Sequence, residues 1–152
     1  MQTPRVFVSA TSADLRSIRS LVKDALLTID CQPIEQSNFP PDYRTVKDRL
    51  RAEIEKCQAL IHIAGYRYGA EPDPSSLPKG AVRRSYTQIE YDIAMELAEE
   101  RGPDKFRLYT FVCGADFPYD QSPDPESDDK RELQRLHRSR IIDGNLVYET
   151  AT

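Results

Sequence analysis

The stretch Ala59-Leu-Ile-His-Ile-Ala64 decides the fold class of this 152-residue chain. It is a near-continuous apolar run, which is typical of a strand that is buried on both faces of a parallel sheet. The run Arg5-Val-Phe-Val-Ser9 has the same β-branched and aromatic character and stops at a polar turn. We therefore expect two adjacent central strands, at Val6–Ser9 and Leu60–Ile63.

Apolar residues at helical spacing fill the intervals between the expected strands. One such face extends from Leu15 to Ile29, a second from Tyr43 to Cys57, and a third from Tyr86 to Leu97. Ser85-Tyr-Thr-Gln88 has the pattern of a capping box that opens the third helix. A fourth helix is expected from about Asp128 to Ile141.

Three further strands complete the pattern. Residues 31–36 contain Pro33, which favours an edge strand, and further strands are expected at 106–112 and 145–149. Alternating strands and helices predict an α/β fold with a parallel sheet and helices on both faces. Five strands favour the flavodoxin-like order 2-1-3-4-5, whose switch point lies between the first and third strands.

Composition and charge exclude several classes of protein. The formal net charge is −4, so the basic footprint of a nucleic-acid-binding protein is missing, and no apolar run approaches the roughly 18 residues of a membrane span. Three widely spaced cysteines fit reduced thiols in the cytoplasm. His62 is expected to be a hydrogen-bonded core residue and His137 a surface residue. Neither has a second His or a Cys at ligand spacing, so we expect no metal.

A ligand site is expected at the carboxyl ends of the strands. Three segments converge there, namely residues 9–12, residues 65–69 and the start of the helix after Ser85. Glu90 flanks the buried face of that helix and should tilt towards the crevice. A carboxylate near a helix N-terminus tends to stay ionised, which suits the stabilisation of an oxocarbenium-like centre. The other interpretation of Glu90 is a solvated surface carboxylate.

The order and spacing of three motifs resemble a Toll/interleukin-1 receptor (TIR) domain. They are VFVSAT at 6–11, GYRYG at 65–69 and SYTQIEYDIA at 85–94, and the resemblance extends over residues 5 to about 112. It is closest to the TIR-like domains at the N-termini of bacterial NLR-type (STAND) antiphage defence proteins. It implies one flavodoxin-like, TIR-like domain over 1–152, expected to be the N-terminal effector piece of a longer cytoplasmic protein.

The resemblance also implies an activity. Glu90 matches by place the glutamate with which catalytic TIR domains cleave the nicotinamide–ribose bond of NAD⁺, although Tyr86-Thr87 stands where the family has Trp-Cys. NAD⁺ or a related nucleotide is then the substrate, no cofactor is needed, and copies of the domain self-associate. Phe39 is the expected stacking residue of the loop at 37–42. The expected substrate-binding residues are Ser9, Thr11, Ser12, Phe39, Tyr66, Tyr68, Arg84 and Tyr86.

Some roles and functions stay open at this point. Tyr66 and Tyr68 either pack on the rim of the crevice or stack on a base, and Arg84 either pairs with a substrate phosphate or decorates its loop. The alternatives to an NAD⁺ glycohydrolase are a non-catalytic TIR-like module for homotypic assembly and a nucleoside deoxyribosyltransferase-like enzyme. They are separated by whether Glu90 faces a pocket lined by Ser9, Thr11 and Tyr66.

Overall fold

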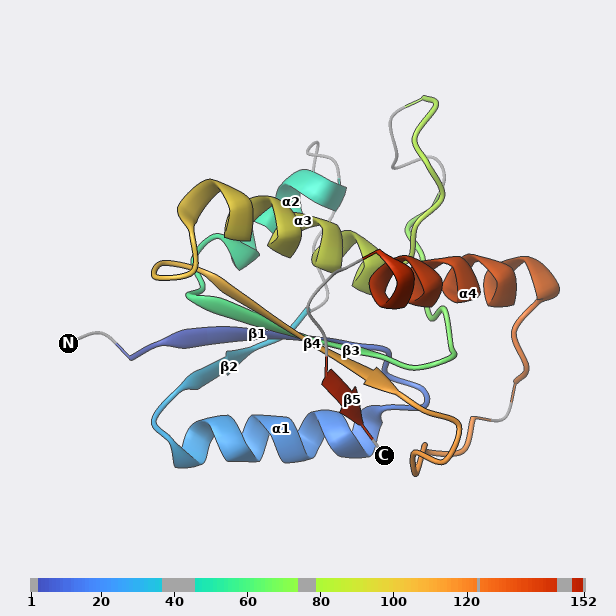
Figure 1. Cartoon of the computed structure of the whole chain (residues 1–152), viewed down its shortest axis with the longest axis horizontal. Helices are drawn as coiled ribbons and strands as arrows, with labels where there is room; N and C mark the ends of the chain where they lie inside the picture. The colour runs from blue at the N-terminus through green and yellow to red at the C-terminus, as the bar shows by residue number, and fades with distance from the viewer. Residues whose placement is uncertain (1–2, 37–45, 74–78, 123, 145–148, 152) are drawn as a thin grey trace.

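A computed structural model describes the chain over residues 3–36, 46–73, 79–122, 124–144 and 149–151 (Figure 1). The strands are β1 (Arg5–Ala10), β2 (Gln32–Ile34), β3 (Ala59–Ala64), β4 (Arg107–Cys113) and β5 (Glu149–Ala151). The helices are α1 (Arg16–Thr28), α2 (Val46–Ile54), α3 (Tyr86–Arg101) and α4 (Asp128–Asp143). Figure 1 shows α1 on one face of the sheet and α2, α3 and α4 on the other.

The sheet confirms the α/β expectation. All its described pairings are parallel, and the strand order is β2-β1-β3-β4. The three-residue β5 extends the sheet beside β4, whereas most of the strand expected over 145–149 lies outside the described residues. As predicted, β1 and β3 are interior neighbours, with Ser9 opposite His62. The segment with Pro33 forms the edge strand β2.

Apolar layers on both faces fix the positions of the two central strands. Burying a Leu, Ile or Phe side chain stabilises a fold by roughly 1.5–3 kcal/mol, so these layers hold the carboxyl ends of β1 and β3 firmly in place. The layer towards α2 and α3 includes Phe7, Leu50, Ile54, Leu60, Ile93, Leu97 and Phe106. The layer towards α1 includes Ala10, Leu15, Ile63 and Cys113.

Two expectations about helix faces are wrong. Leu21 and Ile29, assigned to the apolar face of the first helix, are 63% and 67% exposed, because α1 contacts the sheet through a narrower stripe that includes Ile18, Val22 and Leu26. His137, expected at the surface, is only 1% exposed. It shares the inner face of α4 with buried Gln134 and Ile141, at a helical spacing that the surrounding arginines obscure in the sequence.

The capping box of α3 is confirmed. The Ser85 hydroxyl accepts a hydrogen bond from the Gln88 backbone N–H at 3.2 Å, and the Gln88 side chain accepts one from the Ser85 N–H at 3.3 Å. This reciprocal pair sets where α3 begins and therefore where Glu90 lies. Among the helices of the described part of the chain, none combines the length and apolar character needed to cross a membrane.

Candidate functional site

The site lies where the central strands end and α3 begins. Because β1 and β3 are parallel neighbours, the segments that follow Ala10 and Ala64 leave the sheet at the same edge. At this edge the two segments line a cavity of about 200 Å³. Its lining residues are Ala10, Thr11, Ser12, Arg19, Gln36, Ala70, Tyr86, Thr87 and Glu90.

Glu90 is the buried acid of this cavity. Its side chain is 1% exposed, and neither carboxyl oxygen has a hydrogen-bond partner in the described structure. Burial raises the pKa of Glu90 to about 8, against the smaller opposing effects of the Ser9 hydroxyl and the Arg19 charge. Glu90 therefore faces a cavity, but it is mostly protonated at neutral pH.

The expectation that Glu90 stays ionised in the free protein is wrong. Glu90 is the fifth residue of α3, beyond the first turn in which the helix dipole acts most strongly. The desolvation of a fully buried carboxylate therefore outweighs the favourable charge of the helix N-terminus.

Three of the expected substrate-binding residues line the cavity with Glu90. Thr11 and Ser12 enter it from the end of β1, and Tyr86 enters from the first turn of α3. Thr11 is buried, and its hydroxyl donates a hydrogen bond to the Asp14 carboxylate. The Ser12 side chain, by contrast, is exposed.

The structure places the other expected residues elsewhere. Ser9 is fully buried and hydrogen-bonds His62 instead of lining the cavity. The Tyr68 ring is also fully buried, and its hydroxyl donates to Glu71 at 3.0 Å, so this ring is not free to stack on a base. Tyr66 is 50% exposed and lines a different cavity. Phe39 lies outside the described residues.

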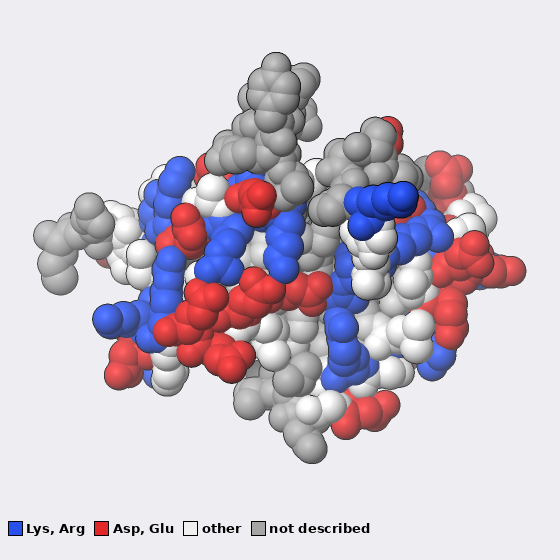
Figure 2. Space-filling model, turned by 90° about the horizontal axis from the view of Figure 1, so that it is seen from above, with Lys and Arg blue, Asp and Glu red and all other residues white. Residues whose placement is uncertain are grey.

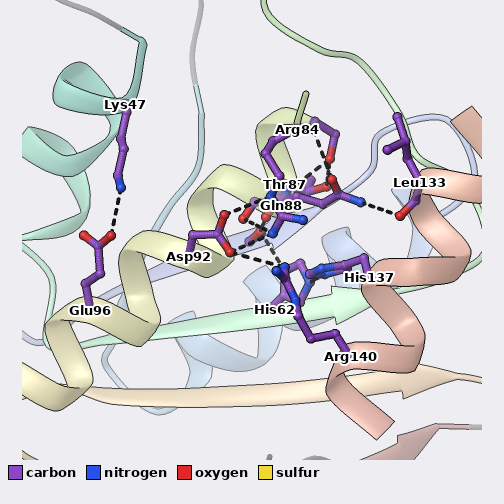
Figure 3. A network of polar contacts seen from close by, with 12 residues as sticks. Lys47, His62, Arg84, Thr87, Gln88, Asp92, Glu96, Leu133, His137 and Arg140 are labelled. Carbon is purple, nitrogen blue, oxygen red and sulfur yellow. Dashed lines mark hydrogen bonds and ion pairs between the residues drawn. The ribbon is translucent and has the colours of Figure 1, made fainter. Parts of the chain in front are cut away.

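Arg84 binds a carboxylate of its own chain. Its guanidinium donates to both oxygens of Asp92, over 2.9 and 2.6 Å, and Figure 3 shows the two side chains turned towards each other. This bidentate geometry is the strong form of the ion pair. The sequence left two roles open for Arg84, pairing with a substrate phosphate or a place in its own loop. The ion pair with Asp92 favours the second.

Sequence reasoning missed Arg19 and Gln36, which line the same cavity as Glu90. Arg19 lines the cavity from α1 and lowers the pKa of Glu90, while its Nε also pairs with Glu35 at 3.2 Å. Arg16, the first residue of α1, carries the same charge in the same turn, so no local signal in the sequence singles out Arg19. Gln36, just after β2, has no signal either.

A comparison with protein families identifies the chain. The family model described as a domain of unknown function, DUF4062, matches residues 5–140. The chain belongs to the DUF4062 family. The match includes every element that lines the Glu90 cavity. No curated protein matches this DUF4062 domain.

Two further cavities of the DUF4062 domain adjoin the first through shared residues. A cavity of about 510 Å³ shares Ser12 and Ala70 with the Glu90 cavity and adds Arg67 and Lys130. A third, of about 290 Å³, shares Arg67 with the second and is lined by Tyr66 and Tyr119. The rings of this tyrosine pair meet edge to face, with centroids 6.2 Å apart. The cavities thus follow one another along the same edge of the sheet.

The loop after β3 is fastened at this edge of the DUF4062 domain. The Glu126 carboxylate accepts hydrogen bonds from the backbone N–H groups of Tyr68 and Gly69, at 2.6 and 2.8 Å. Gly69 has φ +84°, and a Cβ there would lie 2.8 Å from Cγ2 of Thr11. Only glycine fits both this backbone conformation and this close approach to the cavity wall.

The outer face over α2 and α3 carries charges of both signs. Lys47 and Arg51 of α2 pair with Glu96 of α3 at 2.8 and 3.0 Å, and Arg51 also reaches Glu100. Figure 2 shows this face, with basic and acidic side chains interleaved. Within the described residues, no cluster of three or more His, Cys, Asp or Glu side chains has an arrangement that would hold a metal ion.

Proposed function

We propose that this DUF4062 domain is a TIR-like effector that cleaves the nicotinamide–ribose N-glycosidic bond of NAD⁺ in bacterial immunity. One observation carries the proposal. Glu90, a buried carboxyl group to which no described residue gives a hydrogen bond, lines a cavity at the carboxyl ends of the parallel strands. That is the place where the resemblance to TIR domains puts the glutamate needed for this reaction.

The topology supports the TIR-like part of the proposal. With β5 included, the strand order is β2-β1-β3-β4-β5, which is the flavodoxin-like order of TIR domains. In such sheets the switch point lies between the first and third strands, and ligands bind beside it. The Glu90 cavity opens at that junction, between the segments that follow β1 and β3.

Glu90 would act by charge. When the C1′–N bond breaks, its electron pair leaves with nicotinamide, and positive charge develops on the ribose. An ionised Glu90 next to C1′ stabilises that charge. Water then adds to C1′ and loses a proton, so that NAD⁺ and water yield ADP-ribose, nicotinamide and H⁺.

The raised pKa of Glu90 fits this role if the substrate ionises it. The nicotinamide ring of NAD⁺ is cationic, and a cation brought next to a buried carboxyl group favours the ionised form of that group. Glu90 would thus lose its proton as NAD⁺ binds, without the cost of a buried charge in the free protein.

The row of cavities offers room for the rest of the dinucleotide. With nicotinamide riboside at Glu90, the diphosphate would lie in the middle cavity, where Ser12, Arg67 and Lys130 stand beside the acids Asp124 and Glu126. Arg67 would have to exchange its 4.0 Å contact with Glu126 for the phosphates, so Lys130 is the cation we expect to bind them first. The adenine would then reach Tyr66 and Tyr119, which line the third cavity, although the Arg138 guanidinium already lies over the Tyr66 ring at 3.8 Å from its centroid. We assign substrate binding to Ser12, Arg67, Lys130, Tyr66 and Tyr119, and to Thr11, Arg19 and Tyr86.

Nicotinamide release tests the proposal. The protein is incubated with NAD⁺ over a range of concentrations and again after fusion to an oligomeric tag, because self-association raises the effective concentration of shared sites. We expect turnover that rises with clustering. Glu90→Gln should reduce it by about 100- to 1000-fold.

Glu99→Gln is the matched control. It makes the same change at an exposed position of the same helix and should leave turnover unchanged. Equal turnover by wild type and Glu90→Gln would exclude Glu90 as the catalytic residue. Assembly without turnover would favour the interaction module, and transfer of deoxyribose between bases would favour the deoxyribosyltransferase.

A further inference from the structure

A chain of buried polar side chains lies behind Glu90. The Ser9 hydroxyl of β1 is 3.0 Å from Nδ1 of His62 on β3, and Nε2 of His62 is 3.0 Å from Nε2 of His137 on α4. All three side chains are at most 1% exposed. Figure 3 shows the two imidazoles pointing towards each other. Three elements that are distant in the sequence thus meet in one line of hydrogen bonds.

Both imidazoles are neutral, so the contact between them has a donor and an acceptor. Burial lowers the pKa of His62 to about 3, and burial also lowers the pKa of His137. The positive charges of Arg84, Arg138 and Arg140 act on the pair in the same direction. A neutral imidazole has one N–H and one bare nitrogen, so one of the two Nε2 atoms carries the proton.

Either His62 or His137 donates the hydrogen bond between the two Nε2 atoms. The unpaired Nδ1 of His137, at the end of this line of hydrogen bonds, decides which of them is the donor. Nδ1 of His137 is buried and has no hydrogen-bond partner in the described structure. If His62 were the donor, this Nδ1 would carry an unpaired N–H, and buried unpaired N–H groups are rarer than unpaired acceptors. His137 Nε2–H therefore donates to His62, and His62 carries its proton on Nδ1.

This arrangement fixes the direction of the Ser9 hydroxyl. Nδ1–H of His62 donates to Oγ of Ser9, so the single hydroxyl proton of Ser9 points away from His62. On the α3 side, the Ser9 hydroxyl donates a long hydrogen bond to the backbone carbonyl of Thr87, over 3.5 Å. Glu90 follows one turn later on α3. Its carboxyl oxygens have no hydrogen-bond partner in the described structure, and the Ser9 hydroxyl lowers the pKa of this carboxyl group.

We propose that His137 and His62 are positioning residues that keep Ser9 as a hydrogen-bond donor for ionised Glu90. His137 determines which nitrogen of His62 is protonated, and His62 keeps the Ser9 proton on the α3 side. When Glu90 ionises, Ser9 turns this proton from the Thr87 carbonyl to the carboxylate. Arg19 of α1 acts on the same carboxyl group by charge. The catalytic consequence rests on the function proposed above, whereas the proton arrangement does not.

Nuclear magnetic resonance tests the arrangement in the wild-type chain. Long-range ¹⁵N–¹H correlation spectra of the histidine rings should show His62 protonated on Nδ1 and His137 on Nε2. The opposite pair of tautomers would overturn the proposal. This measurement uses the wild-type chain alone. It therefore tests the proton arrangement even if replacements in the core prevent folding.

The pKa of Glu90, followed by its side-chain ¹³C carboxyl resonance, tests the transmission. Ser9→Ala should raise it by about one pH unit, because a hydrogen bond to the charged form is lost. His137→Leu should also raise it, because His62 is then free to accept from Ser9. His137→Gln keeps an N–H donor and is the matched control, with a pKa near that of wild type.

The outcomes separate this inference from the proposed function. A Glu90 pKa that does not move in folded Ser9→Ala or His137→Leu would overturn the relay, whatever the activity. A pKa that moves as expected in a protein that never cleaves NAD⁺, even when clustered, would uphold the relay and reject the proposed function. In an active protein, the pH profile of kcat/KM should move with the pKa of Glu90.

Discussion

Glu90→Gln should make the stability of the fold less dependent on pH. The folded protein holds a proton on Glu90 up to a pKa of about 8, whereas the ordinary value is 4.5. Between these values the folded state binds one proton more than the unfolded state, so the free energy of unfolding of the wild type falls as pH rises. The stabilising contribution of the protonated form is fully present below pH 4.5 and is lost as pH rises through 8.

The size of the effect follows from this single proton. One proton corresponds to about 1.36 kcal/mol per pH unit at 25 °C. From pH 6 to pH 8 the wild type should therefore lose about 2 kcal/mol from this group, and the Gln variant should lose none of it. His62 and His137 titrate alike in both proteins, so their effect cancels in the difference.

Urea denaturation at pH 6, 7 and 8, followed by far-ultraviolet circular dichroism, measures this difference. The stability of Glu90→Gln relative to wild type should increase by about 2 kcal/mol over that range. Glu99→Gln, exposed on the same helix, should parallel the wild type. A constant difference between wild type and Glu90→Gln would refute the assignment of a buried, protonated carboxyl group.

Other measurements probe the same region. If the ionised form of Glu90 is the active one, kcat/KM for NAD⁺ should rise about tenfold per pH unit below 8 and level off above it. Gly69→Ala should lower the melting temperature more than Gly80→Ala, because both glycines have positive φ but only Gly69 has Thr11 at 2.8 Å; equal losses would contradict this. Iodoacetamide, followed by mass spectrometry, should modify partly exposed Cys31 before the two thiols whose burial raises their pKa to about 11, Cys57 and Cys113.

Local patterns were enough to predict the strands that form the site. The runs that became β1 and β3 are apolar on both faces, and the proline in β2 marks an edge, so the sequence determines their places without reference to distant residues. Parallel pairing then brings the segments after β1 and β3 to one edge. The position of Glu90 follows from the capping box at Ser85 and Gln88.

Properties that depend on packing from elsewhere were not predictable in this way. Glu90 is protonated because of the elements that enclose it. Its place near a helix N-terminus, which is all that the sequence shows, predicts an ionised carboxylate instead. His137 is buried because the inner face of α4 packs on the sheet, although arginines surround it in the sequence. The sequence placed Tyr68 at the rim of the crevice. Its ring is instead buried, in a loop whose backbone N–H groups donate hydrogen bonds to Glu126.

The pairing of β1 with β3 also has a consequence for how the chain folds. Ser9 and His62 stand opposite each other but are 53 residues apart in the sequence. Such a pairing closes a long loop before it gains any contact energy, which slows folding. During synthesis, one edge of the apolar strand β1 stays unpaired until β3 has left the ribosome. Variants that weaken β3 should therefore increase the aggregation of nascent chains more than α1 variants that lower the free energy of unfolding by the same amount.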